Sequence, residues 1–322
     1  MRYSENKYHL LEKLSDKNGI IAALAIDQRG AMRSMIPNLE GEERDSIIRD
    51  FKKNVSEILT PYSSSILLDP IYGLDSIEAR DSDAGLLMAY EVTGYRDDLR
   101  RPSLLEDWSV KGLKEKGAEA IKILLYYDVD DSRENNELKE IFIERVGSEC
   151  LGEDIPFFLE IITYDKNIQD SKSKEFAVLK PHKVNKAIEE FVKPRYNVDV
   201  LKLEVPVNMK YVEGYGEDFV YTKEEAAMYF KEQSDLCSIP FIFLSAGVST
   251  DLFLETLKFA HNAGSQFNGV LCGRATWAGG LPEFLKDREL GREWLLNTGV
   301  DNINTLNEVL KSTAVSWKKN IG

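Results

Sequence analysis

Eight short apolar runs recur along the chain, and amphipathic segments separate them. The runs are rich in aliphatic and β-branched residues and are mostly continuous, which is typical of parallel strands covered on both faces. They span residues 20–27, 64–69, 85–91, 120–127, 156–164, 200–206, 240–246 and 269–273. Eight strands that alternate with helices predict an α/β fold, a single (β/α)₈ TIM barrel.

The segments between the runs carry apolar residues at helical spacing. Helices are predicted over 42–59, 103–116, 136–151, 184–192, 223–237 and 250–263, with an extra N-terminal helix at about 7–14 and two C-terminal helices within 282–317. We expect one barrel domain over residues 1–322. Two long connections, 165–183 and 208–220, follow the fifth and sixth runs and are interpreted as a lid or as an oligomer contact.

Composition excludes several classes of function. The net charge of −14 and the pI of about 4.9 argue against nucleic-acid partners and against an anionic membrane surface. The three cysteines form no CxxC pair and the first 16 residues hold no signal-peptide core, so a cytoplasmic protein is expected. The three histidines lie at no metal-ligand spacing, so neither a metal site nor a cofactor is predicted.

Charged residues inside apolar runs are the main functional signal. Lys202 lies in the run 200–206 and shares a face with Glu204. A buried ammonium is costly unless it is paired or used, and a desolvated lysine can attack a carbonyl to form a Schiff base. The alternative is an edge strand with Lys202 in water. Lys122 and Glu160 occupy similar positions in two other runs, so we expect all three in one interior, as catalytic groups or as a structural ion-pair network.

Polar residues also follow several runs, where a barrel places its catalytic face. Asp27 ends the first run, Asp69 the second and Glu91 the third. A structural cap of the following turn is the alternative interpretation for Asp27 and Asp69.

The ends of the last two runs predict a phosphate site. Ser245-Ala246-Gly247 and Gly273-Arg274 combine small residues with a guanidinium, at the two strands where barrel enzymes commonly bind phosphate. Two lysines, carboxylates and a phosphate site suit the breaking of a C–C bond next to a ketone through a Schiff base.

Several long motifs resemble the class I tagatose-1,6-bisphosphate aldolases of Gram-positive bacteria, and the resemblance runs through nearly the whole chain. The motifs are ALAIDQRGA at 23–31, AIKILLYYDVD at 120–130, EDIPFFLEIITYD at 153–165, DVLKLEVPVNMKYVEG at 199–214 and GVLCGRATWAGG at 269–280. The resemblance implies metal-independent cleavage of D-tagatose 1,6-bisphosphate to glycerone phosphate and D-glyceraldehyde 3-phosphate, in lactose and galactose catabolism. Fructose 1,6-bisphosphate is expected as a second substrate.

The resemblance also implies roles for single residues. Lys202 forms the Schiff base, Glu160 is the acid/base residue, and Asp27 and Lys122 contact the sugar hydroxyls. The predicted phosphate-binding residues are Ser245, Gly247, Gly273 and Arg274 for the C1 phosphate, with Arg29 and Gln28 near the C6 phosphate. The predicted partner is the sugar bisphosphate, and a homodimer is expected. Rival interpretations are a barrel phosphosugar isomerase, another Schiff-base aldolase, and a phosphosugar-binding protein with a regulatory partner. Glu204 has no assigned role.

Overall fold

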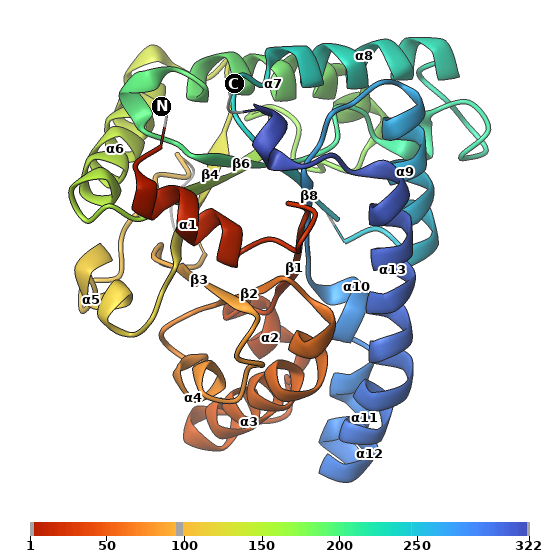
Figure 1. The fold of residues 1–322 in the computed structure, drawn as a ribbon. Coiled ribbons are helices and arrows are strands. Elements are labelled where there is room, and N and C mark those ends of the chain that lie inside the picture. The colour runs from red at the N-terminus through yellow and green to blue at the C-terminus, as the bar shows by residue number, and fades with distance from the viewer. Residues whose placement is uncertain (1–2, 95–98, 246, 321–322) are drawn as a thin grey trace.

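The computed structural model describes residues 3–94, 99–245 and 247–320 (Figure 1). Eight parallel strands close into one barrel in the order β1 to β8, which confirms the predicted fold class. The strands are β1 (Ile21–Ala25), β2 (Ser65–Leu68), β3 (Gly85–Ala89), β4 (Ala120–Tyr127), β5 (Phe157–Thr163), β6 (Val200–Leu203), β7 (Phe241–Leu244) and β8 (Gly269–Cys272). Each lies within one predicted run. The seventh run ends at Ala246, which lies outside the described residues.

Helices surround the barrel (Figure 1). The longer ones are α1 (Glu5–Lys13), α3 (Gly41–Leu59), α6 (Arg133–Gly152), α7 (Lys174–Phe191), α8 (Lys223–Leu236), α9 (Thr250–Asn262) and α13 (Val300–Thr313). The shorter ones are α2 (Gly30–Met35), α4 (Leu74–Ile77), α5 (Val110–Glu115), α10 (Arg274–Trp277), α11 (Gly280–Lys286) and α12 (Arg288–Trp294). None of the helices in the described ranges is long and apolar enough to cross a membrane.

Three predicted elements were wrong in extent. The helix expected over 103–116 is only α5, because residues 103–105 pair with residues 90–92, just after β3, through a bridge between Leu104 and Glu91. The connection 165–183 is helical from Lys174 onward, because the Ser173 hydroxyl caps α7 by accepting from the amide of Phe176. The tail beyond residue 282 contains more than the two expected helices, since Asp287 starts α12 by accepting from two following amides.

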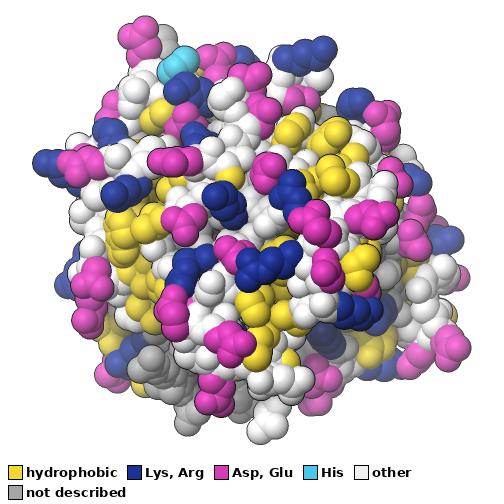
Figure 2. All heavy atoms as spheres, turned by 90° about the horizontal axis from the view of Figure 1, so that it is seen from below, with side chains coloured by type: hydrophobic (Ala, Val, Ile, Leu, Met, Phe, Trp, Pro, Cys, Tyr) yellow, Lys and Arg dark blue, Asp and Glu magenta, His cyan; other side chains and the backbone are white. Residues whose placement is uncertain are grey.

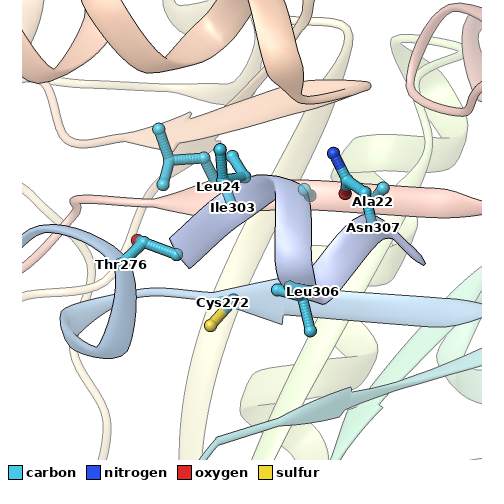
Figure 3. Close-up of a pocket in the computed structure, with 8 residues that line it drawn as sticks. Ala22, Leu24, Cys272, Thr276, Ile303, Leu306 and Asn307 are labelled. Atoms are coloured by element: carbon cyan, nitrogen blue, oxygen red, sulfur yellow. The ribbon is translucent and has the colours of Figure 1, made fainter. Parts of the chain in front are cut away.

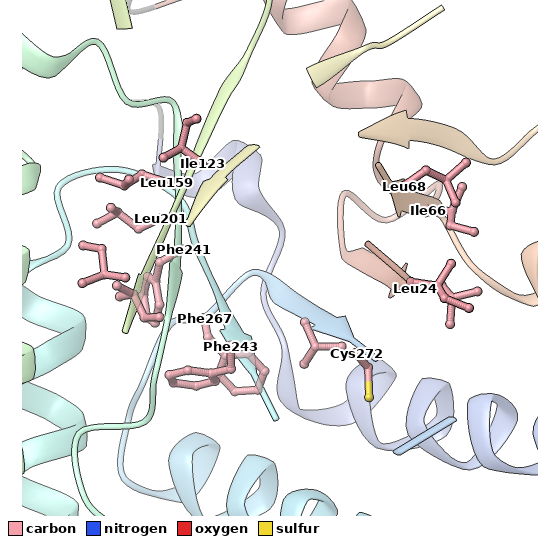
Figure 4. Close-up of a cluster of buried hydrophobic side chains, with 14 of the residues drawn as sticks. Leu24, Ile66, Leu68, Ile123, Leu159, Leu201, Phe241, Phe243, Phe267 and Cys272 are labelled. Atoms are coloured by element: carbon pink, nitrogen blue, oxygen red, sulfur yellow. The ribbon is translucent and has the colours of Figure 1, made fainter. Parts of the chain in front are cut away.

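Strand alternation divides the buried side chains into two cores. One core fills the space between strands and helices, and Figure 4 shows part of it, including Ile123, Leu159 and Leu201. The other fills the barrel itself and includes Phe158, Val200 and Ile242. Because every second residue points inward, the parity that buries Phe158 and Val200 in the barrel also directs Glu160 and Lys202 inward.

The two ends of the chain pack together at the amino ends of the strands. Trp317 is fully buried beside α1, with its ring 5.1 Å from that of Tyr8, and its indole N–H donates to Ser15 Oγ at 3.0 Å. Leu11 and Leu14 join the same inner core. This packing covers the barrel end opposite the carboxyl ends of the strands, so the inner charges must be approached from the other end.

The outer layers are tightly packed. A seam between β1, β8 and α13, lined by side chains that include Leu24, Cys272 and Leu306, has no room for a water molecule (Figure 3). On the face shown in Figure 2, acidic and basic side chains are interspersed, with apolar side chains in small groups between them. The exposed surface in that view therefore shows no single-sign charged field.

Candidate active site

A cleft of about 690 Å³ opens at the carboxyl ends of the strands. Lys122 of β4, Glu160 of β5 and Lys202 of β6 line it, and the β5–β6 register sets Glu160 directly beside Lys202. The three side chains are at most 9 % exposed. The structure therefore brings the three charges of the apolar runs into one interior wall, and Lys202 does not point from an edge strand into water.

Glu160 bridges the two lysines. Its Oε1 lies 2.8 Å from Lys202 Nζ, and its Oε2 lies 2.8 Å from Lys122 Nζ. Lys122 Nζ also donates to Asp27 Oδ2 at 2.9 Å. Asp27 thus belongs to the network, whereas Asp69 has the structural role: it pairs with Lys52, and its Oδ1 accepts from the amides of residues 71 and 72.

The network favours the charged forms of Asp27, Glu160 and Lys122. Burial raises the pKa of the Asp27 and Glu160 carboxyls, but the ammonium groups of Lys122 and Lys202 outweigh it, and both pKa values fall below their usual range. Burial likewise lowers the pKa of Lys122, but the facing carboxylates raise that pKa well above the usual lysine value. Lys122 is therefore a fixed positive charge at neutral pH.

Glu91 is a further member, noted in the sequence only as the end of the third run. It is 2 % exposed, and its Oε1 accepts from Lys122 Nζ at 3.0 Å. Arg29 donates through Nη1 to the Glu91 carbonyl at 2.7 Å and through Nη2 to Oε1 at 3.3 Å. Oε2 accepts from the amide of Leu124 at 3.2 Å. Glu91 thus fixes both Lys122 and Arg29, and Arg29 still lines the cleft.

Glu204 pairs with a lysine that sequence reasoning missed. Its Oε2 accepts from the amide and the hydroxyl of Thr163, at 2.7 and 2.8 Å, and its Oε1 lies 3.5 Å from Lys180 Nζ. Lys180 comes from α7 and is 6 % exposed. The only sequence signal was its place in the connection after the fifth run, which was interpreted as a loop.

The predicted phosphate-binding residues line the same cleft at the ends of β7 and β8. Gly247 has φ +71°, and a Cβ there would lie 3.2 Å from Arg274 Nη2. A Cβ at Gly273 would lie 3.2 Å from Gln28 Nε2. The two glycines therefore let Arg274 and Gln28 approach the backbone closely. Ser245 also lines the cleft, while Ala246 lies outside the described residues.

Within the described residues, no group of three or more His, Cys, Asp or Glu side chains is arranged to hold a metal ion. The cleft holds paired lysines and carboxylates, and Gly247, Gly273 and Arg274 line it at the ends of β7 and β8. Ionisable side chains gathered in the mouth of a closed (β/α)₈ barrel define the class of the chain as a barrel enzyme.

Comparison with known proteins shows which family of barrel enzymes the chain resembles. The family model described as DeoC/LacD family aldolase matches residues 21–279, and the chain belongs to this aldolase family. A tagatose 1,6-diphosphate aldolase of Staphylococcus aureus (strain JH9) is 57 % identical over 324 residues, 99 % of each chain.

Solved structures share the fold at low sequence identity. A Schiff base forming fructose-1,6-bisphosphate aldolase has a TM-score of 0.56 at 14 % identity, covering 93 % of this chain and 99 % of that one. The fructose-bisphosphate aldolase of Plasmodium falciparum has a TM-score of 0.68 at 15 % identity, covering 96 % and 95 %. These likenesses agree with the TIM barrel described above.

Proposed function

We propose that this enzyme cleaves D-tagatose 1,6-bisphosphate to glycerone phosphate and D-glyceraldehyde 3-phosphate through a Schiff base on Lys202, without a metal ion. The relative that is 57 % identical over 99 % of the chain carries this substrate in its name. The observation that carries the mechanism is the 2.8 Å contact between Lys202 Nζ and Glu160 Oε1 in a buried wall. A proton can pass directly between these atoms, which leaves the neutral amine that nucleophilic attack requires.

The first half of the reaction forms the Schiff base. The Lys202 amine attacks the C2 carbonyl carbon, and the carbonyl π electrons pass to oxygen. A proton moves from the nitrogen to that oxygen to give the carbinolamine, which then takes a proton from Glu160 and loses its hydroxyl as water. The product is a C2 iminium, which withdraws electrons from the C3–C4 bond. Glu160 leaves this step as a carboxylate, the form that its pKa below the usual range favours.

Cleavage of the C3–C4 bond uses the negative charge of Glu160 and the positive charge of the iminium. Glu160 accepts the proton of the C4 hydroxyl, C4 becomes an aldehyde carbonyl, and the electrons of the C3–C4 bond pass to the iminium to give an enamine. Protonation at C3 and addition of water at C2 then release glycerone phosphate and the free amine. Lys122 and Asp27 orient the sugar hydroxyls, and the fixed positive charge of Lys122 stabilises a developing alkoxide.

The C1 phosphate is assigned to the ends of β7 and β8. Ser245, Gly247, Gly273 and Arg274 line that part of the cleft, and Arg274 supplies the charge. Gln28 was expected near the C6 phosphate, but it lies beside Gly273, and we therefore assign its amide to the C1 phosphate instead. Buried Gln28 Oε1 has no hydrogen-bond partner within the described residues, which leaves that amide free to bind a ligand hydroxyl.

A cleavage assay with coupled detection of both triose phosphates tests the proposal, with and without EDTA. We expect turnover that EDTA leaves unchanged, and a borohydride-stable adduct with glycerone phosphate in the wild type but not in Lys202→Ala. Lys186→Ala, an exposed lysine paired with Glu189 on α7, is the matched control and should trap normally. Turnover that survives in Lys202→Ala would exclude the Schiff-base mechanism and favour an isomerase or another non-covalent reaction.

The domain organisation, the location, the second substrate, the pathway and the oligomeric state remain predictions. A single domain over residues 1–322 is supported by the packing of α1 against Trp317, which joins the first and last helical segments. A cytoplasmic location is supported by three buried cysteines without disulfides. Fructose 1,6-bisphosphate as a second substrate, the lactose and galactose route, and a homodimer rest on the sequence resemblance alone.

A further inference from the structure

The cleft carries more positive than negative charge, although the chain as a whole has a net charge of −14. Seven basic and four acidic side chains line it. Each of the four carboxylates is paired with a cation of the cleft: Asp27, Glu91 and Glu160 with Lys122, and Glu204 with Lys180. The excess of cations is therefore available to a ligand with several negative charges.

Three of the basic side chains in the cleft have no ion pair within the described residues: Arg274, Lys172 and Lys210. Arg274 follows β8. Lys172 belongs to the connection from β5 to α7, and Lys210 to a short helical turn after β6. In the strand order, β6 with Lys202 stands between β5 on one side and β7 and β8 on the other. Of the unpaired cations, Lys172 therefore comes from the β5 side of the amine and Arg274 from the β8 side, while Lys210 follows β6 itself.

Lys180 belongs to α7, which follows the connection that contains Lys172. Unlike Lys172 and Lys210, which are exposed, it is 6 % exposed and held in the cleft wall by Glu204, which Thr163 fixes with two hydrogen bonds. An ammonium has three donors, and its one ion pair, to Glu204 at 3.5 Å, is long for a hydrogen bond. Donors therefore remain for a ligand oxygen in the cleft.

We propose that Lys180, with Lys172 and Lys210 at the mouth, binds the phosphate at the far end of the substrate, while Arg274 binds the phosphate next to the ketone. The proposal rests on the proposed function and adds to it the residues that make the enzyme prefer a bisphosphate over a monophosphate substrate. Arg29 is less available for this role, because both of its Nη groups donate to Glu91. Glu204 is then a positioning residue for Lys180.

Comparison of two substrates tests the proposal: a ketohexose 1,6-bisphosphate and the matching ketohexose 1-phosphate, which lacks the distal phosphate. Lys180→Met should lower kcat/KM for the bisphosphate by about 10- to 100-fold, the range for one charge-assisted hydrogen bond. It should leave kcat/KM for the 1-phosphate, and adduct formation with glycerone phosphate, within about twofold. Lys180→Arg should restore most of the difference, because it keeps the charge. Lys186→Met on the same helix should change neither substrate.

The outcomes separate the two proposals. A wild type that cleaves neither ketose overturns the proposed function itself. A wild type that cleaves both, with Lys180→Met affecting both equally or neither, overturns the distal-phosphate assignment alone. The distal-phosphate assignment would also be overturned if Arg29→Met lost the preference for the bisphosphate while Lys180→Met kept it. The distal phosphate would then bind at the end of β1. Activity on the 1-phosphate reports that each variant is folded.

Discussion

Lys202 Nζ and Glu160 Oε1 lie 2.8 Å apart because their strands hold them in direct register. The distance is set by the hydrogen-bonded ladder between β5 and β6, and no loop contributes to it. Both side chains point into the barrel above the inner apolar core that contains Phe158 and Val200. A proton donor and acceptor placed on rigid strands need no rearrangement before the amine can react.

Glu160→Gln should separate Schiff-base formation from turnover. The amide keeps the size of the carboxylate but cannot exchange a proton, and its one oxygen can accept from only one of the two lysines. We expect kcat to fall by roughly 10²-fold or more, because each catalytic cycle needs the proton transfers of Glu160. The adduct with glycerone phosphate on Lys202 should form more slowly, but borohydride should still trap it after long incubation. Mass spectrometry of the trapped protein and a steady-state assay measure the two effects. Glu189→Gln, at an exposed site on α7, is the control, and normal turnover in Glu160→Gln would refute the acid/base role.

Substitutions at the β8 end should act on substrate binding. Arg274→Ala should raise KM by about 10- to 100-fold, the cost of one charge-assisted contact to phosphate, with a smaller change in kcat. Gly247→Ala should act in the same direction, because a Cβ would lie 3.2 Å from Arg274 Nη2 at a φ of +71°. Initial rates over a range of substrate concentrations measure both. A fall in kcat at unchanged KM would contradict a binding role.

Stability should fall steeply in acid because of the buried carboxylates. The pKa values of Asp27 and Glu160 lie below their ordinary values of 3.8 and 4.5 in the folded chain. The unfolded state therefore binds more protons in this range, so the free energy of unfolding rises with pH. The contribution is complete above about pH 4.5 and is lost as the pH falls through the lower folded-state values. Urea unfolding between pH 7 and pH 3 measures this slope.

The variant Asp27→Asn with Glu160→Gln is the control for that slope. Without the two titrating groups, the free energy of unfolding should depend less on pH between 5 and 3 than it does in the wild type. Equal slopes in the two proteins would assign the acid sensitivity to other carboxylates, such as Asp165. Burial raises the pKa of Asp165, but its hydrogen bond to Lys183 outweighs burial and lowers it.

The barrel and the central charges were predictable because each corresponds to a pattern within a single segment of the sequence. An apolar run is visible as such, and a charge inside it, as at Lys122, Glu160 and Lys202, is unusual enough to indicate function. Glu91 was visible only as the end of a run, because its partners Lys122 and Arg29 lie 31 and 62 residues away and their pairing depends on the barrel register. Lys180 was missed because its contact with Glu204 depends on how α7 packs against the barrel, and no local pattern encodes that.

Lys122→Met should damage activity and stability together. Its ammonium contacts Asp27, Glu91 and Glu160, so its removal leaves three buried carboxylates without their shared cation. We expect a loss of about 3–5 kcal/mol in the free energy of unfolding at pH 7, the range for breaking a buried ion pair, and a large fall in kcat.

The loss in Lys122→Met should shrink as the pH falls. Without Lys122 the carboxylates bind protons more readily, and the protonated forms no longer need a counter-charge. Urea unfolding of Lys122→Met and wild type at pH 7 and pH 5 measures the difference, with exposed Lys186→Met as the control for a general loss of positive charge. A difference that is the same at both pH values would mean that the lost packing of the lysine stem, and not the uncompensated carboxylates, destabilises the variant.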